Sequence, residues 1–191
     1  MNLDDAEILK RVCDGQLELF DELVLRYRGP LLRVAENKLG NAAWAEDVVQ
    51  EAFLAAYAAR ETFNPQFSFR TWLWTILLNL CRRQLRRRSN RPREWSNSES
   101  GTPSLQIAEP ATDETGLSRA LLAESRQQLI SLLCELPEVQ ADALRLRFFG
   151  GLKYDEIARA MNSSVSAAKV RVRNGLIRMA DQLRDEDGEV Q

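Results

Sequence analysis

The stretch that decides the fold is GLKYDEIARAMNSSVSAAKVRVR, residues 151–173. A short first helix in it would bury three apolar side chains, Ile157, Ala158 and Met161. The helix stops at Asn162-Ser163, because Asn tolerates the left-handed backbone of a tight turn. Ser164 is a good N-cap for a second helix. The spacing therefore predicts two short helices joined by a tight turn.

The second helix has two different faces. Its predicted buried stripe has helical spacing and consists of Val165, Ala168, Val172, Leu176, Met179 and Leu183. The opposite face carries Ser166, Lys169, Val170 and Arg173, with Arg171 towards its edge. A helix with basic side chains on its outer face fits the major groove of DNA, as in a helix-turn-helix. An ordinary helical hairpin with a polar outer face remains the alternative at this point.

Nearly all the periodic segments in the rest of the chain have the helical period, which predicts an all-α fold. Long helices are expected at about 42–60 and 69–88, and Pro30 is expected to start or kink a helix. Ser, Asn, Pro, Thr and Glu dominate after residue 88, a composition typical of a linker. We therefore predict two small helical domains joined by a flexible linker: domain 1–88, linker 89–117, domain 118–184 and acidic tail 185–191.

Charge is segregated along the chain, although the net charge is only −2. One basic cluster without acids consists of Arg82, Arg83, Arg86, Arg87, Arg88, Arg91 and Arg93. The second consists of Arg145, Arg147, Lys153, Arg159, Lys169, Arg171, Arg173 and Arg178, against only Asp155 and Glu156. One such cluster is equally well explained as a solvated helix end. A basic cluster in each domain favours a protein that touches a polyanion at two places.

Several function classes lose support from the composition. The chain has no histidine, which removes the commonest general base and metal ligand, so an enzyme is not expected. Cys13, Cys81 and Cys134 lack metal-ligand spacing, and buried structural thiols are expected instead. The acidic N-terminus does not resemble a secretory signal, and the apolar run at 72–81 is too short to span a bilayer. We expect a cytoplasmic protein without membrane insertion.

The motifs taken together resemble the extracytoplasmic-function (ECF) sigma factors of the sigma-70 family. The resemblance rests on residues 46–53 (EDVVQEAF), 69–76 (FRTWLWTI) with Asn79, Leu136-Pro137, and 154–173. It implies a sigma region 2 bundle and a sigma region 4 helix-turn-helix, no cofactor, and core RNA polymerase and promoter DNA as partners. It also implies an anti-sigma factor that holds the protein inactive.

The resemblance implies a polymerase-binding surface on the helix near residue 50. Asp47, Gln50 and Glu51 share one exposed arc, because residues three and four apart are neighbours on a helix. Val48, Val49, Ala52, Phe53 and Tyr57 are expected to supply its packing side. The implied polymerase-binding residues are Glu46, Asp47, Gln50 and Glu51. A solvated helix face is the plainer explanation of the same pattern.

Two DNA-binding surfaces follow from the same resemblance. The implied minus-10 residues are Asn64, Gln66, Phe67, Ser68, Asn79, Arg82, Arg83 and Arg86. Phe69, Trp72 and Trp74 are also of a suitable type for single bases, but the helical spacing of Trp72 favours a core position. The implied minus-35 residues are Ser166, Lys169, Arg171 and Arg173.

Two other functions stay open from the sequence. One is a free-standing helix-turn-helix regulator that dimerises and binds palindromic duplex DNA without polymerase. The other is a helical enzyme, which has little support in the absence of histidine and of a phosphate-binding loop. The aromatic loop and the polymerase-binding helix of the first domain favour the sigma factor.

Overall fold

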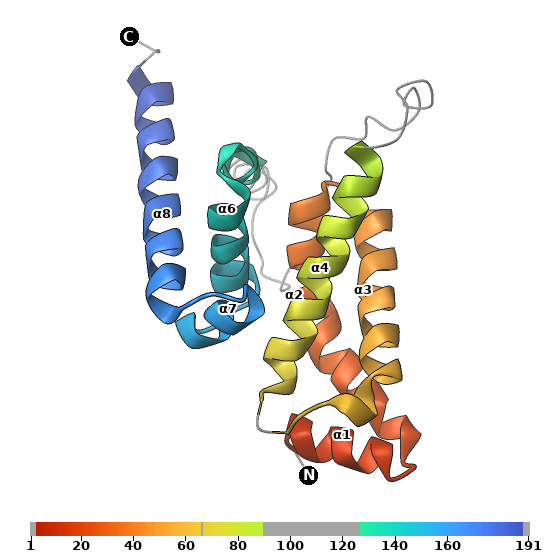
Figure 1. Ribbon diagram of the computed structural model, residues 1–191. Helices are drawn as coiled ribbons and strands as arrows, with labels where there is room; N and C mark the ends of the chain where they lie inside the picture. Colours follow the sequence, from red (N-terminus) through yellow and green to blue (C-terminus); the bar gives the residue numbers. More distant parts are fainter. Residues whose placement is uncertain (1–2, 66, 90–126, 189–191) are drawn as a thin grey trace, which may run out of the picture.

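A computed structural model describes residues 3–65, 67–89 and 127–188, with side chains up to residue 184. Every regular element in these ranges is helical, which confirms the predicted all-α class. No helix among these residues has both the length and the apolar character needed to cross a membrane. The helices form two units that lie side by side (Figure 1).

The first unit contains α1 (Asp5–Cys13), α2 (Phe20–Leu39), α3 (Ala42–Ala58) and α4 (Phe69–Ser89). Helices α2, α3 and α4 run alongside one another, and α1 crosses one end of them (Figure 1). Two short 3-10 turns, Leu17–Leu19 and Arg60–Thr62, precede α2 and follow α3. Their shared core places one face of α3 and one end of α4 at the surface.

Two neighbouring residues determine the turn between α2 and α3. Gly40 ends α2 in the left-handed conformation, with φ 65°, which costs least for glycine. Asn41 then caps α3, because its side chain accepts a hydrogen bond from the Trp44 amide at 2.9 Å. Pro30, expected to start or kink a helix, lies inside the continuous helix α2.

The second unit begins with a helical stretch at 127–135. Pro137 is the N-cap of α6 (Glu138–Leu144), which continues into a π-helical turn, η4 (Arg145–Phe149). Helices α7 (Tyr154–Ala160) and α8 (Val165–Gly188) follow. Gly151, with φ 64°, supplies the left-handed residue between η4 and α7.

The two units share one continuous core. Helix α4 packs against α7, and α2 packs against η4. Gly150 lies against the ring of Trp74, and a Cβ on Gly150 would sit 3.2 Å from that ring. The sequence predicts the two units, but this contact between them comes only from the structure. The predicted linker, from residue 90 onward, and the last residues of the predicted tail, 189–191, lie outside the described residues.

Candidate functional site

The α7–turn–α8 segment has the predicted helix-turn-helix geometry. Asn162 has φ 48°, as expected for the tight turn, and the Ser163 amide donates to the Ala158 carbonyl at 2.7 Å. The Ser164 hydroxyl accepts from the Ala167 amide at 3.1 Å and so caps α8. These bonds hold the start of α8 beside α7.

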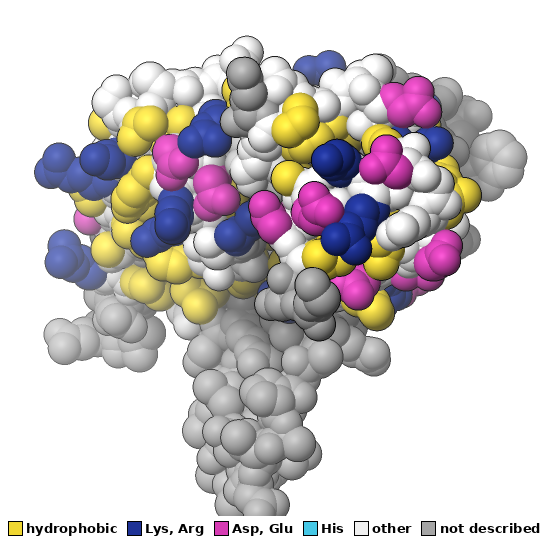
Figure 2. Space-filling model, turned by 90° about the horizontal axis from the view of Figure 1, so that it is seen from below, with side chains coloured by type: hydrophobic (Ala, Val, Ile, Leu, Met, Phe, Trp, Pro, Cys, Tyr) yellow, Lys and Arg dark blue, Asp and Glu magenta, His cyan; other side chains and the backbone are white. Residues whose placement is uncertain are grey.

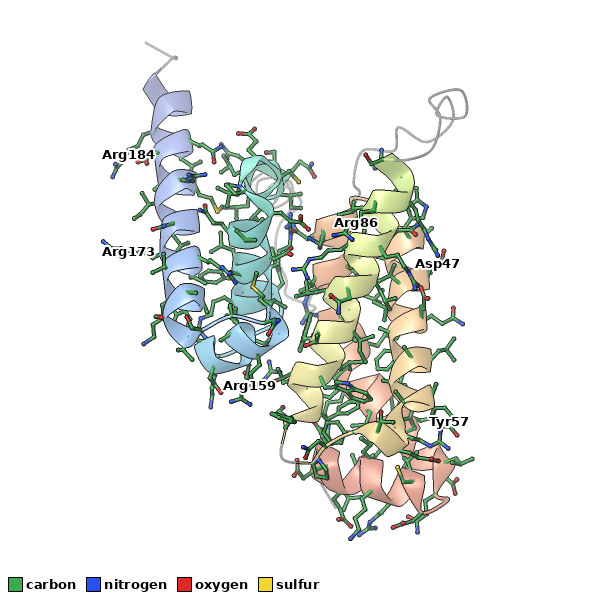
Figure 3. The ribbon with its side chains drawn as sticks, viewed as in Figure 1. Asp47, Tyr57, Arg86, Arg159, Arg173 and Arg184 are labelled. Atoms are coloured by element: carbon green, nitrogen blue, oxygen red, sulfur yellow. The ribbon has the colours of Figure 1, made fainter. Side chains whose placement is uncertain are left out.

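The four implied minus-35 residues lie within two turns at the start of α8. Ser166, Lys169 and Arg173 are exposed, and Arg171 is half-buried. In Figure 3, Arg173 points away from α6 and α7. Figure 2 shows Lys and Arg side chains along the outer edge of this second unit. The α8 surface therefore presents separated positive charges to the surroundings.

The predicted buried stripe of α8 is wrong at two positions. Val165 and Leu176 are 43% and 45% exposed. Ala168 and Val172 are buried as predicted, Met179 and Leu183 are half-buried, and Gly175 is a buried residue that the predicted stripe did not include. Gly175 belongs to the buried side because Leu144 of α6 lies against it, so close that a Cβ would meet the Leu144 Cδ1 at 2.8 Å. Leu176 is one residue further round and faces outward.

An aromatic contact fixes part of this basic surface, and the sequence analysis did not identify it. The Arg147 guanidinium carbon lies 5.0 Å from the centre of the Tyr154 ring, and the Lys169 ammonium lies 6.0 Å from it. Both distances fit cation–π attraction. Tyr154 therefore links a cation on η4 to one on α8.

The acidic face of α3 is placed as predicted. Glu46, Asp47, Gln50 and Glu51 are all exposed, and Figure 3 shows Asp47 pointing away from the bundle. The predicted packing residues Val48, Val49, Ala52 and Phe53 are buried, and Tyr57 is half-buried. Glu46 lies 4.0 Å from Arg28, and Glu51 pairs with Arg83 of α4.

Beside this acidic face lies a groove of about 470 Å³ between α2 and α3. Most of its lining is apolar, with Arg28, Glu46 and Gln50 adding polar groups; the full lining is Phe20, Val24, Arg28, Leu32, Glu46, Val49, Gln50, Phe53, Leu54 and Tyr57. Leu54 is 61% exposed there. An apolar groove with a polar edge suits the apolar face of an amphipathic helix.

A second hollow, of about 500 Å³, lies along the C-terminal half of α4. Its lining is basic and amide-bearing: Asn79, Arg82, Arg83, Arg86 and Arg87. The structure thus brings together four of the implied minus-10 residues and adds Arg87 to them. Four guanidinium groups around one hollow suit the oxygens of a phosphate backbone.

The implied loop residues lie at the other end of α4. Phe67 is 55% exposed, and its amide donates to the Asn64 carbonyl at 3.0 Å. Ser68 precedes α4, and its hydroxyl lies 3.5 Å from the Thr71 amide. Gln66 lies outside the described residues. About ten residues of helix separate this loop from Asn79, a distance of about 16 Å.

The aromatic residues of α4 serve mainly as core. Phe69 and Trp74 are buried, so their suitability for base contacts is overturned by their packing. Trp72 is half-buried, and its ring centre lies 5.2 Å from that of Phe63 and 5.9 Å from that of Phe69. The preference for a core position at Trp72 agrees with these ring contacts.

Two of the implied minus-10 arginines have acidic partners within the chain. Arg82 donates to the Asp142 carboxylate at 3.2 Å and lies 3.7 Å from Glu138, both on α6. Arg83 pairs with Glu51. The side of α4 that faces α6 also carries Arg86 (Figure 3).

Comparison with known proteins assigns both units. Sigma-70 region 2 matches residues 23–91, and sigma-70 region 4 matches residues 126–179. The RNA polymerase sigma-H factor of Pseudomonas aeruginosa is 31% identical over 88% of both chains. The ECF RNA polymerase sigma-E factor of Escherichia coli K12 is 32% identical over 89% of both chains.

Two solved structures have the same fold. The structure of CnrH in complex with the cytosolic domain of CnrY has a TM-score of 0.69 and 23% identity, covering 95% of this chain and 97% of the other. The sigma factor RpoE of Bartonella quintana, solved in complex with the anti-sigma factor NepR, has a TM-score of 0.63 and 25% identity, covering 86% of this chain and 96% of the other.

Proposed function

The chain belongs to the ECF group of the sigma-70 family of RNA polymerase sigma factors, and from that premise we propose how its two units divide the work of promoter recognition. The protein directs core polymerase to specific promoters and initiates transcription. We assign polymerase binding and the minus-10 element to residues 1–88, and the minus-35 element to residues 118–184. Residues 89–117 are the proposed linker, and 185–191 the acidic tail.

Core polymerase docks on α3 in this proposal. The observation that carries it is the apolar groove bordered by Glu46 and Gln50, with Asp47 and Glu51 exposed on the same helix. A partner helix with an apolar stripe would bury Leu54, and basic side chains on it would meet the acidic edge.

The minus-10 strand follows α4. Single bases are held at the loop by Asn64, Gln66, Phe67 and Ser68, and the exposed Phe67 ring offers a stacking surface. Phosphates are held in the basic hollow, the lining of which includes Asn79, Arg82, Arg83 and Arg86.

The minus-35 element is read by the start of α8. Ser166, Lys169 and Arg173 are exposed on one helix that begins at a capped N-terminus, and this geometry suits insertion into a major groove. Arg171, which is half-buried, is assigned to a phosphate at the edge of the contact.

Three further assignments rest on the family. An anti-sigma factor holds the protein inactive, an assignment supported by the similar sigma factor RpoE of Bartonella quintana, which was solved in complex with an anti-sigma factor. The protein acts in the cytoplasm, where polymerase works, and has no catalytic activity of its own. A free-standing regulator is not favoured, because the match includes region 2, which such a regulator does not need.

The decisive experiment adds the purified chain to core RNA polymerase and genomic DNA and sequences the transcripts. We expect start sites that depend on the chain and share two upstream elements. The proposal fails if the chain does not bind core enzyme, or if it binds palindromic duplex DNA as a stable homodimer without polymerase.

A further inference from the structure

Three cations surround one carboxylate at the contact between the two units. Asp142 of α6 is fully buried. The Lys38 ammonium donates to it at 2.6 Å, the Arg82 guanidinium at 3.2 Å and the Arg145 guanidinium at 3.5 Å. A buried carboxylate with this set of partners is stable only while they stay in place.

Two of those cations come from the other unit. Lys38 lies in the last turn of α2 and Arg82 lies on α4, whereas Arg145 follows Asp142 in the same unit. Glu138, one turn before Asp142, adds a second carboxylate 2.9 Å from Lys38 and 3.7 Å from Arg82. Glu138 and Asp142 therefore share one face of α6 and meet the same two cations.

Other polar bonds continue the contact along α4 and α2. Arg145 donates to the Asn37 side chain at 2.6 Å. At the far end, Arg70 donates to the carbonyls of Gly150 and Gly151 at 2.7 and 3.0 Å. The contact thus combines oriented polar groups along its length with an apolar part, in which Trp74 lies against Gly150.

The contact between the two units also involves one residue that lines the basic hollow. Arg82 lines that hollow, but its guanidinium is bound to carboxylates of α6. Carboxylate and phosphate oxygens are equivalent acceptors for a guanidinium, so α6 and a DNA backbone compete for Arg82. The pair Glu138 and Asp142 has the chemistry of a phosphate substitute.

The composition of the interface between the two units also permits the units to separate. Buried ion pairs lose much of their attraction to desolvation, and each charge regains water when the units separate. Contacts between domains of one chain resemble transient protein interfaces and permit relative motion. A DNA strand offers several phosphates in a row, whereas α6 offers two carboxylates, so DNA can displace α6.

We propose that Glu138 and Asp142 act as an intramolecular phosphate mimic that holds the free chain closed and withholds Arg82 from DNA. The inference rests on the proposed function, because it assigns Arg82 to the promoter strand. In the closed chain the two DNA-binding units are fixed against each other. Separation of α6 from α4 is then a step that precedes engagement of the minus-10 strand.

The test compares the full-length chain with Asp142→Asn, without polymerase. The probe is a fluorescein-labelled single-stranded oligonucleotide of mixed sequence, followed by anisotropy, and small-angle X-ray scattering gives the radius of gyration. We expect Asp142→Asn to have a larger radius of gyration and to bind the probe at least about fivefold more tightly. Asp181→Asn, the same change at an exposed ion pair of α8, is the matched control and should change neither quantity.

Lys38→Met is the second variant, because it opens the same contact without adding or removing an acid. Far-UV circular dichroism identifies any variant that loses helix. If Asp142→Asn loses helix, the comparison of size and affinity is made with Lys38→Met alone. The inference is overturned if the unaltered chain is already extended in solution, or if folded variants match it in both size and affinity. The proposed function fails separately, if no variant and no unaltered chain yields promoter-dependent transcripts with core enzyme.

Discussion

The Lys38 ammonium lies 2.6 Å from the Asp142 carboxylate, although 104 positions separate the two residues in the sequence. Lys38 lies in the last turn of a helix of the first unit, and Asp142 lies in a helix of the second. Their side chains are 2% and 0% exposed. This buried ion pair therefore joins the two units.

Glu138 makes this coupling sensitive to acid. The hydrogen bond from Lys38 is the main cause that lowers the pKa of Glu138, and Arg82 and Arg86 act in the same direction. A carboxyl with a lowered folded-state pKa stabilises the fold above its unfolded pKa and loses that contribution as pH falls through the folded value. We expect thermal midpoints measured from about pH 5 down to pH 3 to fall less steeply for Glu138→Gln than for the unaltered chain. Glu135→Gln is the control, and equal slopes for all three proteins would refute the assignment.

Thiol reactivity reports on the buried contact. Burial raises the pKa of Cys81 to about 12, and Lys38 and Arg82 offset this only in part. Cys13 and Cys134 are exposed, so the expectation of buried thiols is wrong for these two and right only for Cys81. Since the thiolate is the reactive form, a chromogenic disulfide reagent at about pH 8 should modify two thiols rapidly and the third slowly. Urea should release the third, and Cys81→Ser should lack the slow phase. Three equally fast thiols in the folded chain would contradict the buried position of Cys81.

Leu54 tests the polymerase groove. It is exposed within the apolar lining, where a partner helix would bury it. We expect Leu54→Glu to weaken binding to core polymerase at least about tenfold, the usual effect at a central interface residue, with an unchanged thermal midpoint. Leu25→Glu is the control, because Leu25 is more exposed and does not line the groove. Equal affinities of the two variants would remove the groove from the docking surface.

Lys169 and Arg173 test the minus-35 surface. Each is exposed at the start of α8, and loss of one phosphate contact reduces the salt dependence of binding by about one unit of log K against log salt. We expect this reduction for Lys169→Ala and for Arg173→Ala on a duplex that carries the mapped upstream element. Arg184→Ala, at the far end of the same helix, should keep the original slope (Figure 3). A reduced slope for Arg184→Ala alone would place the contact elsewhere.

The helices and their outward faces could be read from the sequence because both follow local rules. Ser164 caps α8 and Asn162 takes the left-handed turn, both as their residue types indicate. The exposure of Asp47 and Gln50 follows from helical spacing alone, since the apolar residues between them define the packing side.

The predictions from the sequence are wrong where contacts with another helix decide whether a side chain is buried. Helical spacing alone permitted Val165 and Leu176 in the buried stripe of α8. The structure excludes Leu176 because Leu144 of another helix lies against Gly175. Likewise, Trp74 is an aromatic residue suited to a base, but Gly150 of the second unit leaves room for it in the core.

The sequence by itself determined an all-helical chain with two basic surfaces, an acidic helix face and a helix-turn-helix, because helical period, capping and charge order are properties of neighbouring residues. Only the tertiary structure decided which of the basic side chains are bound to acids of the other unit. Arg82 and Lys38 carry the same charge sign in the sequence as Arg86 and Lys169, yet Asp142 binds the first two. Such a pairing depends on how the two units pack against each other, and no local pattern encodes it.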